Sequence, residues 1–313
     1  MFKKSVVIVI SLLILLSLGG LALHSGSSKR TSQSEKIAII YVEGVIVGGR
    51  GQSNVFAEQG GTDLVIKQLH EARDDESVKA VVLRINSPGG SAAASQEVGE
   101  EIKKMRSKGK IVVTSMGDVA ASGGYWLAAC TDKIYANSTT MTGSIGVYVP
   151  YANWEELYKK VGIYQEKIKS GAHKDILSPE RPMTSEERAI IQVMVDDIYN
   201  QFVLVVAEGR KMEEAQVRKL ADGRIYTGNQ AKQLGLVDEL GNMYDAIDGA
   251  AELAGIHNKP EIKEYGKQSP WNMLFGANEQ VGSLLEKVLL NQAKNVLNMG
   301  VPTEMSPDKW QVK

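Results

Sequence analysis

Apolar strand-like segments alternate with helical segments through the first half of this chain. The apolar runs read as buried strands at residues 36–47, 79–85 and 112–116. Helical periodicity covers residues 62–75, 91–108 and 123–130. Because each helix must return the chain to the same edge of the sheet, this alternation produces right-handed βαβ crossovers. The pattern therefore predicts an α/β fold with a mostly parallel sheet.

The second half of the chain is richer in helical patterns. Further short strands are predicted at residues 133–136, 145–149 and 261–265. Amphipathic helices are predicted at residues 186–208, 213–221 and 244–254. The tail, residues 268–313, carries one more predicted helix at residues 280–297. It either packs on its own domain or a neighbouring subunit, or lies on a membrane or substrate surface.

The N-terminus carries a long uncharged segment, residues 5–23, dominated by Val, Ile and Leu. At about 1.5 Å per residue this segment forms a helix of about 28 Å, close to the hydrocarbon thickness of a bilayer. We expect an uncleaved transmembrane anchor after a cytoplasmic N-terminus at residues 1–4, since Lys3 and Lys4 precede it. A cleavable signal peptide is the alternative. In both cases the rest of the chain lies outside the cytoplasm.

A polar, serine-rich linker at residues 24–35 leads into a single large domain, expected at residues 36–267. The formal net charge of the whole chain is −1, which gives no electrostatic footprint for nucleic acid. The single cysteine, Cys130, excludes an internal disulfide and reads as a small buried apolar residue. The four histidines form no pair at metal-ligand spacing, so we expect no metal and no other cofactor.

A serine flanked by small residues follows one of the predicted strands. Ser122 stands in Ala-Ala-Ser-Gly-Gly-Tyr at residues 120–125, between the strand at 112–116 and the helix at 123–130. A strand-to-helix turn without bulky neighbours exposes a nucleophile to a carbonyl group. The N–H of Gly123, at the start of the helix, can then meet the developing oxyanion.

A second turn of the same kind follows the strand at residues 79–85. Its sequence, Asn-Ser-Pro-Gly-Gly-Ser at residues 86–91, opens the next helix. Turns at the carboxyl ends of neighbouring parallel strands face one crevice, where α/β sheets bind ligands. Gly90 in this turn and Gly123 in the other would supply two oxyanion donors.

Two neighbouring residues are candidates for the base that activates Ser122. His173 and Lys174 lie in a small polar loop, residues 170–175, after a strand-like run at residues 164–169. A histidine is the usual general base. A lysine amine serves only when it is neutral, which requires a dry site. The residues alone leave both candidates open.

Five sequence blocks occur together in one order. They are Asn-Ser-Pro-Gly-Gly at 86–90, Ser-Met-Gly at 115–117, Ala-Ser-Gly-Gly-Tyr at 121–125, Thr-Gly-Ser-Ile-Gly at 142–146 and Ser-Gly-Ala-His-Lys at 170–174. Over residues 36–265 the chain resembles the signal peptide peptidase A family. That family consists of membrane-anchored serine proteases with a crotonase/Clp-like fold, a superhelix of repeated ββα units.

The resemblance implies a role for each site residue. Ser122 matches the nucleophile, Lys174 the general base and Ser144 the serine that orients the lysine amine. Gly90 and Gly123 match the oxyanion positions. The short form of the family has one catalytic domain per chain, and its active sites form only where subunits lie side by side. We therefore expect a homo-oligomer with active sites near subunit interfaces.

The resemblance also implies the substrate and the location. The substrates would be remnant signal peptides left in the membrane after their release from secreted proteins. The protein would be a single-pass cell-membrane protein with its catalytic domain outside the cytoplasm. Two alternatives share the fold: a crotonase-like acyl-CoA enzyme, which needs no serine–lysine pair, and a non-catalytic membrane scaffold.

Overall fold

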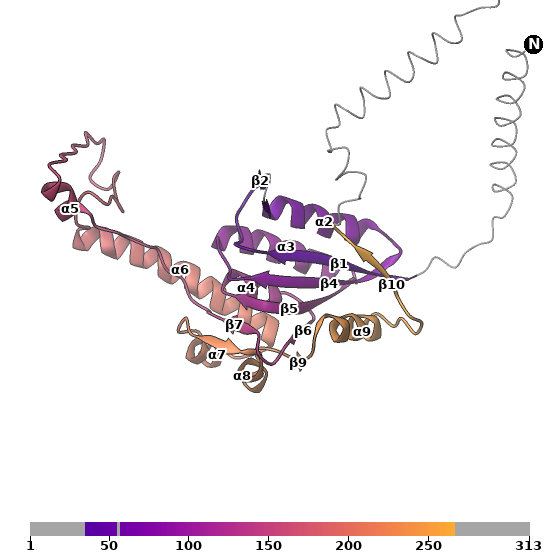
Figure 1. Cartoon of the computed structure of the whole chain (residues 1–313). Helices are drawn as coiled ribbons and strands as arrows, with labels where there is room; N and C mark the ends of the chain where they lie inside the picture. The colour runs from indigo at the N-terminus through magenta and orange to yellow at the C-terminus, as the bar shows by residue number, and fades with distance from the viewer. Residues whose placement is uncertain (1–34, 55–56, 267–313) are drawn as a thin grey trace, which may run out of the picture. The chain divides into compact units, whose positions relative to one another are not determined.

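A computed structural model of the chain describes residues 35–54 and 57–266 (Figure 1). The predicted membrane anchor and the predicted helix of the tail lie outside these residues. The described part contains an eight-stranded sheet with helices packed on both faces and a separate hairpin. The α/β class predicted from the alternating segments is confirmed.

The sheet is parallel along its main path, as predicted. The strands along that path are, in order, β10 (Glu261–Glu264), β1 (Lys36–Glu43), β4 (Val78–Ser87), β5 (Ile111–Ala121), β6 (Lys133–Ala136) and β9 (Glu239–Leu240). Neighbours along this path all pair in parallel. Beyond β6, strand β7 (Met141–Gly143) pairs in parallel with β5 and antiparallel with β8 (Ile225–Thr227). The separate hairpin consists of β2 (Gly51–Asn54) and β3 (Ala57–Gly60).

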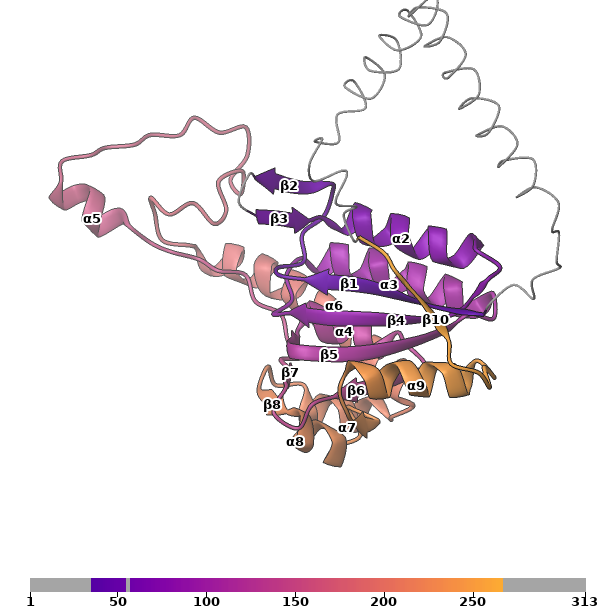
Figure 2. The ribbon, with the colours of Figure 1, turned by 45° about the vertical axis from the view of Figure 1, so that its right-hand side comes forward.

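Helices cover both faces of the sheet because its strands are apolar on both sides (Figure 2). Ala38 and Ile40 of β1 belong to the core beneath α2 (Thr62–Asp74), α3 (Ala92–Ser107) and α4 (Gly123–Ala129). The alternate residues Ile37 and Ile39 belong to a second core beneath α9 (Met243–Leu253). The period of two along the strand thus divides the molecule into three layers.

Helix α6 (Ser185–Arg210) starts away from the sheet and ends on it (Figure 1). Near its C-terminal end Phe202 packs on Trp126 of α4 with ring centroids 4.9 Å apart. Its N-terminal half is largely exposed, and Val193 is 69% exposed. Of the described helices, α6 is the one whose length and composition could cross a membrane. Near its C-terminal end Phe202, Val203 and Val206 are buried in the core, so this end of α6 packs on the domain.

The remaining helices are short. They are α5 (Glu155–Lys160), α7 (Glu214–Leu220) and α8 (Gly228–Gln233). Helix α5 lies in residues 147–184, called the arm below, which connect Gly146 to α6 and project from the sheet with the N-terminal end of α6 (Figure 1). The arm therefore forms an extension of the domain.

Two strand predictions are wrong. Residues 145–149 form no strand; β7 ends at Gly143, and the chain leaves the sheet at Ser144, where φ is +50°. Ile145 is fully buried in the core, whereas Tyr148 is 85% exposed, so the apolar run divides between core and arm. The strand-like run at residues 164–169 is irregular and exposed.

Candidate active site

Ser122 occupies a strained turn between β5 and α4. Its φ of +52° and ψ of −122° are sparsely populated for a residue with a side chain. The backbone is held there by two hydrogen bonds, from the Ser122 N–H to the Gly143 carbonyl at 2.8 Å and from the Trp126 N–H to the Ser122 carbonyl at 2.9 Å. The half-buried Ser122 hydroxyl does not cap α4 and has no hydrogen-bond partner among the described residues. It is therefore available as a nucleophile.

The turn that follows β4 packs directly against Ser122. A Cβ built on Gly89 would lie 2.7 Å from both the Ser122 Cβ and the Gly123 nitrogen, and Gly89 has a φ of +98°. Only glycine fits such a conformation and such a close approach. The two glycine turns predicted from the sequence are therefore in contact.

The two predicted oxyanion donors lie beside Ser122. Ile46 and Gly90 form a parallel bridge. In it the Ile46 N–H donates to the Gly89 carbonyl and the Ser91 N–H donates to the Ile46 carbonyl. The Gly90 N–H therefore donates no hydrogen bond in this bridge. The Gly123 N–H belongs to the first turn of α4, where donors have no acceptor within the helix. A Cβ on Gly123 would lie 3.4 Å from the Gly90 nitrogen. Two backbone N–H groups thus lie close to each other near Ser122, and such a pair is what an oxyanion hole requires.

Ser144 directly follows β7, the strand that pairs with the end of β5, just as Ser122 directly follows β5. In the parallel pairing of β5 with β7, Ala121 is opposite Gly143, so each serine is the next residue after the last pair. Ser144 also has a positive φ, +50°, and its N–H donates to the Arg224 carbonyl at 2.8 Å. The structure thus brings together four of the five predicted site residues.

Lys174 is the fifth predicted residue, and it lies apart from them in the arm. Its side chain is exposed, and its amine has no hydrogen bond or ion pair with a described residue. The rival base, His173, is also in the arm, with Nε2 3.6 Å from Glu186 and Nδ1 3.8 Å from Glu187. Neither candidate base is brought to Ser122 within one chain.

An ion cluster orders the part of the arm that carries Lys174. The Arg181 guanidinium forms two hydrogen bonds to Asp175, at 2.9 and 2.7 Å, and two to Glu187, at 2.8 and 2.5 Å. The Arg181 contact, together with the Thr184 N–H, lowers the pKa of Glu187 to about 2. Arg181 and Lys169 lower the pKa of Asp175, the residue after Lys174. The loop is therefore tied to the N-terminus of α6.

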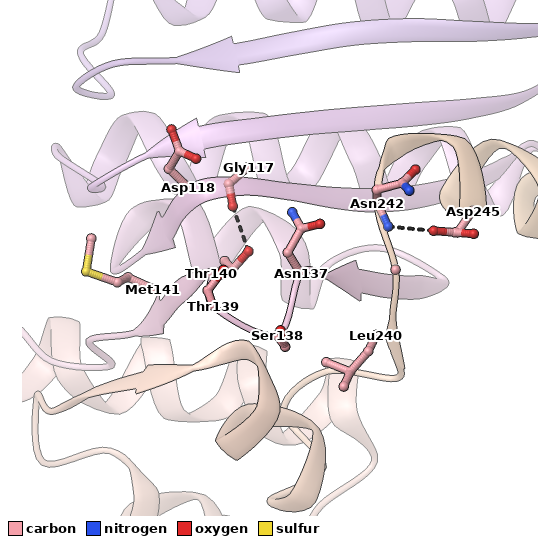
Figure 3. Close-up of a pocket in the computed structure, with 11 residues that line it drawn as sticks. Gly117, Asp118, Asn137, Ser138, Thr139, Thr140, Met141, Leu240, Asn242 and Asp245 are labelled. Atoms are coloured by element: carbon pink, nitrogen blue, oxygen red, sulfur yellow. Dashed lines mark hydrogen bonds between the residues drawn. The ribbon is translucent and has the colours of Figure 1, made fainter.

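A polar hollow of about 870 Å³ lies beside Gly117 and Asp118 of β5, a few residues before Ser122 (Figure 3). Its wall contains Asp118 of β5, Asn137, and the first residues around α9, Asn242 and Asp245. Asp245 already accepts a hydrogen bond from the Asn242 N–H at 2.7 Å, so it serves as a helix cap. The hollow thus borders β5 in the segment that leads to Ser122.

Several structurally prominent residues were not assigned a role from the sequence. Asn86 and Thr140 bind the backbone of β5, and Arg181 organises the arm. Asn86 is the first residue of the Asn-Ser-Pro-Gly-Gly block, and this block was the one sequence signal for it.

Cys130 is buried, as predicted, and burial raises the pKa of its thiol to about 12. Within the part of the chain that the structure describes, no group of three or more metal-ligating side chains gathers.

Two family sequence models match the chain. The model of peptidase family S49 matches residues 104–257, which include Ser122, Ser144 and Lys174. The Clp protease model matches residues 51–151, which include both glycine turns. The second match agrees with the mixed α/β architecture and its mostly parallel sheet.

Several similar proteins carry the name of a protease or peptidase. A putative signal peptide peptidase of Enterococcus faecium is 43% identical over 218 residues, which are 69% of this chain and 63% of that protein. Protease 4 of Haemophilus influenzae is 38% identical over 74% of this chain, but the match spans only 37% of that protein. A putative protease of Synechocystis is 39% identical over 89% of this chain and 96% of its own length. The likeness to the last protein extends over nearly its whole length.

Proposed function

This chain belongs to peptidase family S49 and is similar to signal peptide peptidase A, and from that premise we propose that it is a serine endopeptidase with Ser122 as its nucleophile. The observation that carries the proposal is the strained Ser122 turn, with its unpartnered hydroxyl beside the Gly90 and Gly123 N–H groups. An oxyanion that forms on a peptide carbonyl attacked by Ser122 would meet both donors. Each donor is worth about 3 kcal/mol in the transition state.

Lys174 is the proposed general base. A neutral amine takes the proton of the Ser122 hydroxyl as its oxygen attacks the carbonyl, and returns that proton to the leaving amine. Water then hydrolyses the acyl-enzyme by the reverse route. Ser144, beside Ser122 and able to donate and accept hydrogen bonds, would orient the amine.

The position of the arm supports an active site shared between copies of the chain. Lys174 is exposed on the arm, whereas Ser122 lies at the end of the sheet. We propose that the arm of one copy brings its Lys174 to the Ser122 of a neighbour. The exposed apolar side chains of the arm, among them Tyr148, Tyr164 and Ile168, would be covered in the same contact. Enclosure by the neighbour would also supply the dry site that a neutral lysine requires.

The proposed substrates are remnant signal peptides, held near the enzyme by an anchor at residues 5–23. The name of the Enterococcus relative supports this substrate class. A membrane anchor fits such a substrate, because the peptide also remains in the bilayer.

The proposed orientation places the N-terminus in the cytoplasm and the catalytic domain outside it. Protease added outside spheroplasts should then digest the domain and leave a tag at Met1 intact. Protection of the domain would reverse the orientation.

Labelling with a fluorophosphonate tests the nucleophile directly. The wild-type protein in detergent should be labelled on Ser122 and should cleave a denatured protein substrate. Ser122→Ala should lose both properties while it keeps its melting temperature, because alanine fills the same small turn. Cleavage by Ser122→Ala at the wild-type rate would exclude Ser122 as nucleophile. An acyl-CoA enzyme or a scaffold of this fold would not be labelled.

A further inference from the structure

Strand β5 contains a large bulge just before the nucleophile. Ile85 of β4 is opposite Met116, and Ser87 is opposite Ala120. Between these two pairs, three residues of β5 therefore stand against the single residue Asn86 of β4. Bulges of this kind bend a strand and redirect the residues that follow.

The bulge is also where β5 changes its neighbour on the other side. Before it, residues Val113 to Ser115 pair with β6; from its last residue, Val119, to Ala121 the strand pairs with β7. The strand thus leaves one partner and joins another within a few residues. The segment after the bulge ends at Ser122, so the bend sets the direction in which the nucleophile is presented.

Two side chains bind the polar backbone groups that the bulge removes from the ladder. The Asn86 Oδ1 accepts the Val119 N–H at 3.2 Å. The Thr140 hydroxyl donates to the Gly117 carbonyl at 2.7 Å, as Figure 3 shows. Asn86 also packs on the bulge itself, since a Cβ on Gly117 would lie 3.0 Å from the Asn86 Cβ, Cγ and Oδ1. Without these partners, two backbone groups of the bulge would lose their hydrogen bonds.

Asn86 joins both halves of the candidate site. Its side chain holds Val119, three residues before Ser122, and its backbone leads into the turn that carries Gly90. Its own carbonyl accepts the Gly44 N–H at 3.0 Å, which anchors it to the end of β1. A change at this one position would therefore alter how the nucleophile strand sits relative to the oxyanion turn.

We propose that Asn86 is a positioning residue for Ser122, which sets the placement of the nucleophile relative to the Gly90 N–H by accepting the Val119 N–H across the bulge. Thr140 supports the same bulge from the opposite side. Neither residue touches the reacting atoms. The inference rests on the proposed function and adds residues to that site.

Matched pairs of variants test the proposal in the full-length protein in detergent. Asn86→Leu removes the acceptor and keeps the branching and the number of side-chain heavy atoms, and Asn86→Asp retains the acceptor. Thr140→Val removes the donor, and Thr140→Ser retains it without introducing a charge. The control is Thr131→Val: the Thr131 hydroxyl is equally buried, donates to the Ala128 carbonyl at 2.8 Å and lies 3.1 Å from the hydroxyl of Thr114, which precedes the bulge in β5.

The measurements are kcat and KM on a denatured protein, the rate of fluorophosphonate labelling and the melting temperature. A misplaced reacting group costs up to about 100-fold in rate. We expect Asn86→Leu and Thr140→Val to lower kcat and the labelling rate about 10- to 100-fold, with KM within about twofold. Asn86→Asp, Thr140→Ser and Thr131→Val should stay within about threefold of the wild-type kcat.

Three results would overturn the proposal. They are a wild-type kcat in Asn86→Leu, an equal loss of kcat in Thr131→Val, or an Asn86→Asp protein as slow as Asn86→Leu. If Asn86→Leu does not fold, the Thr140 pair and its control decide the question. Labelling of the wild type and its loss in Ser122→Ala test the proposed function separately, so each idea can fail alone.

Discussion

Gly123 and Ser95 lie against each other beside the nucleophile. A Cβ on Gly123 would collide with the Ser95 Oγ, while the next nearest atoms lie at 3.4 Å. Gly123 has an ordinary helical backbone, so the collision, rather than strain in φ, excludes a side chain there. The Ser95 hydroxyl donates to the Ser91 carbonyl at 2.9 Å, and the Ser95 N–H donates to the same carbonyl at 3.0 Å. Loss of the hydroxyl therefore leaves that acceptor satisfied.

This contact predicts that Ser95→Ala rescues Gly123→Ala. The single change Gly123→Ala overpacks the turn and should cost about 1–3 kcal/mol of stability and most of the activity. In the double variant the Oγ is absent, so most of the melting temperature and labelling rate should return. Thermal unfolding and fluorophosphonate labelling provide the readouts. A double variant no better than Gly123→Ala would contradict the steric explanation.

Substitutions at Lys174 and His173 distinguish the two candidate bases. Lys174→Arg keeps the positive charge, but a guanidinium does not deprotonate in a protein, so it should be as inactive as Lys174→Ala. His173→Ala should retain most of kcat, because in the lysine mechanism His173 is only a neighbour. The steady-state kcat of all three variants is the measurement. An inactive His173→Ala with an active Lys174→Ala would replace the dyad by a Ser–His pair.

Some residues of the candidate site could be identified from the sequence alone, and others could not. Ser122, Gly90 and Gly123 could be found because their turns have a local signature, small residues at the end of an apolar strand. Asn86 could not be assigned a role, because its partner Val119 is 33 positions away and the bulge between them depends on strand pairing. Local sequence patterns carry no information on that register.

At the scale of elements, the arm is held by carboxylates whose charge depends on pH. Arg181 and the Thr184 N–H lower the pKa of Glu187 from 4.5 to about 2. A lowered pKa means that the folded arm favours the ionised form. The stabilisation is therefore fully present above pH 4.5 and is lost as the pH falls from 4.5 towards 2. Asp175 changes in the same direction.

We expect hydrogen exchange in the arm to show this dependence. Protection of the backbone at residues 170–184, corrected for intrinsic exchange rates, should fall as the pH is lowered below 4.5. Glu187→Gln should already lower that protection at pH 7 and flatten its pH dependence. Glu156→Gln is the control, since Glu156 forms an exposed pair with Lys159. A wild-type profile in Glu187→Gln would show that the cluster does not order the arm.

Among the elements, long periodic segments were predicted better than short irregular ones. The helix predicted at residues 186–208 is α6, Ser185–Arg210, and its start is marked by a capping box at Thr184 and Glu187. The strand predicted at residues 145–149 was wrong, because Ser144 turns the chain out of the sheet. The apolar residues at the start of the arm have the sequence pattern of a buried strand, yet Tyr148 among them is exposed. An exposed apolar segment cannot be distinguished from a buried strand by its sequence pattern alone.

At the scale of the whole molecule, the proposed active site is incomplete in one chain. Four site residues meet at the end of the sheet, and Lys174 lies on the arm. The sequence could supply the dyad only through a family resemblance, since neither local pattern nor spacing tells which copy provides the base. The arrangement predicts that the two halves of the dyad can come from different chains.

Mixing two inactive variants tests this arrangement. Ser122→Ala retains Lys174, and Lys174→Ala retains Ser122, so each alone should be inactive. The two variants are co-expressed in equal amounts with different tags, so each copy in a symmetric assembly has either variant as its neighbour with equal probability. About one quarter of the contacts between copies then contain both an intact Ser122 and an intact Lys174. Purification through both tags removes unmixed assemblies, so we expect between about one quarter of the wild-type kcat, for a large assembly, and about one half, for a dimer. Co-expression of Ser122→Ala with a chain that carries both substitutions is the control and should stay inactive. Doubly tagged complexes of the two single variants that show no activity would mean that each chain builds its own dyad, with the arm folding back onto its own sheet.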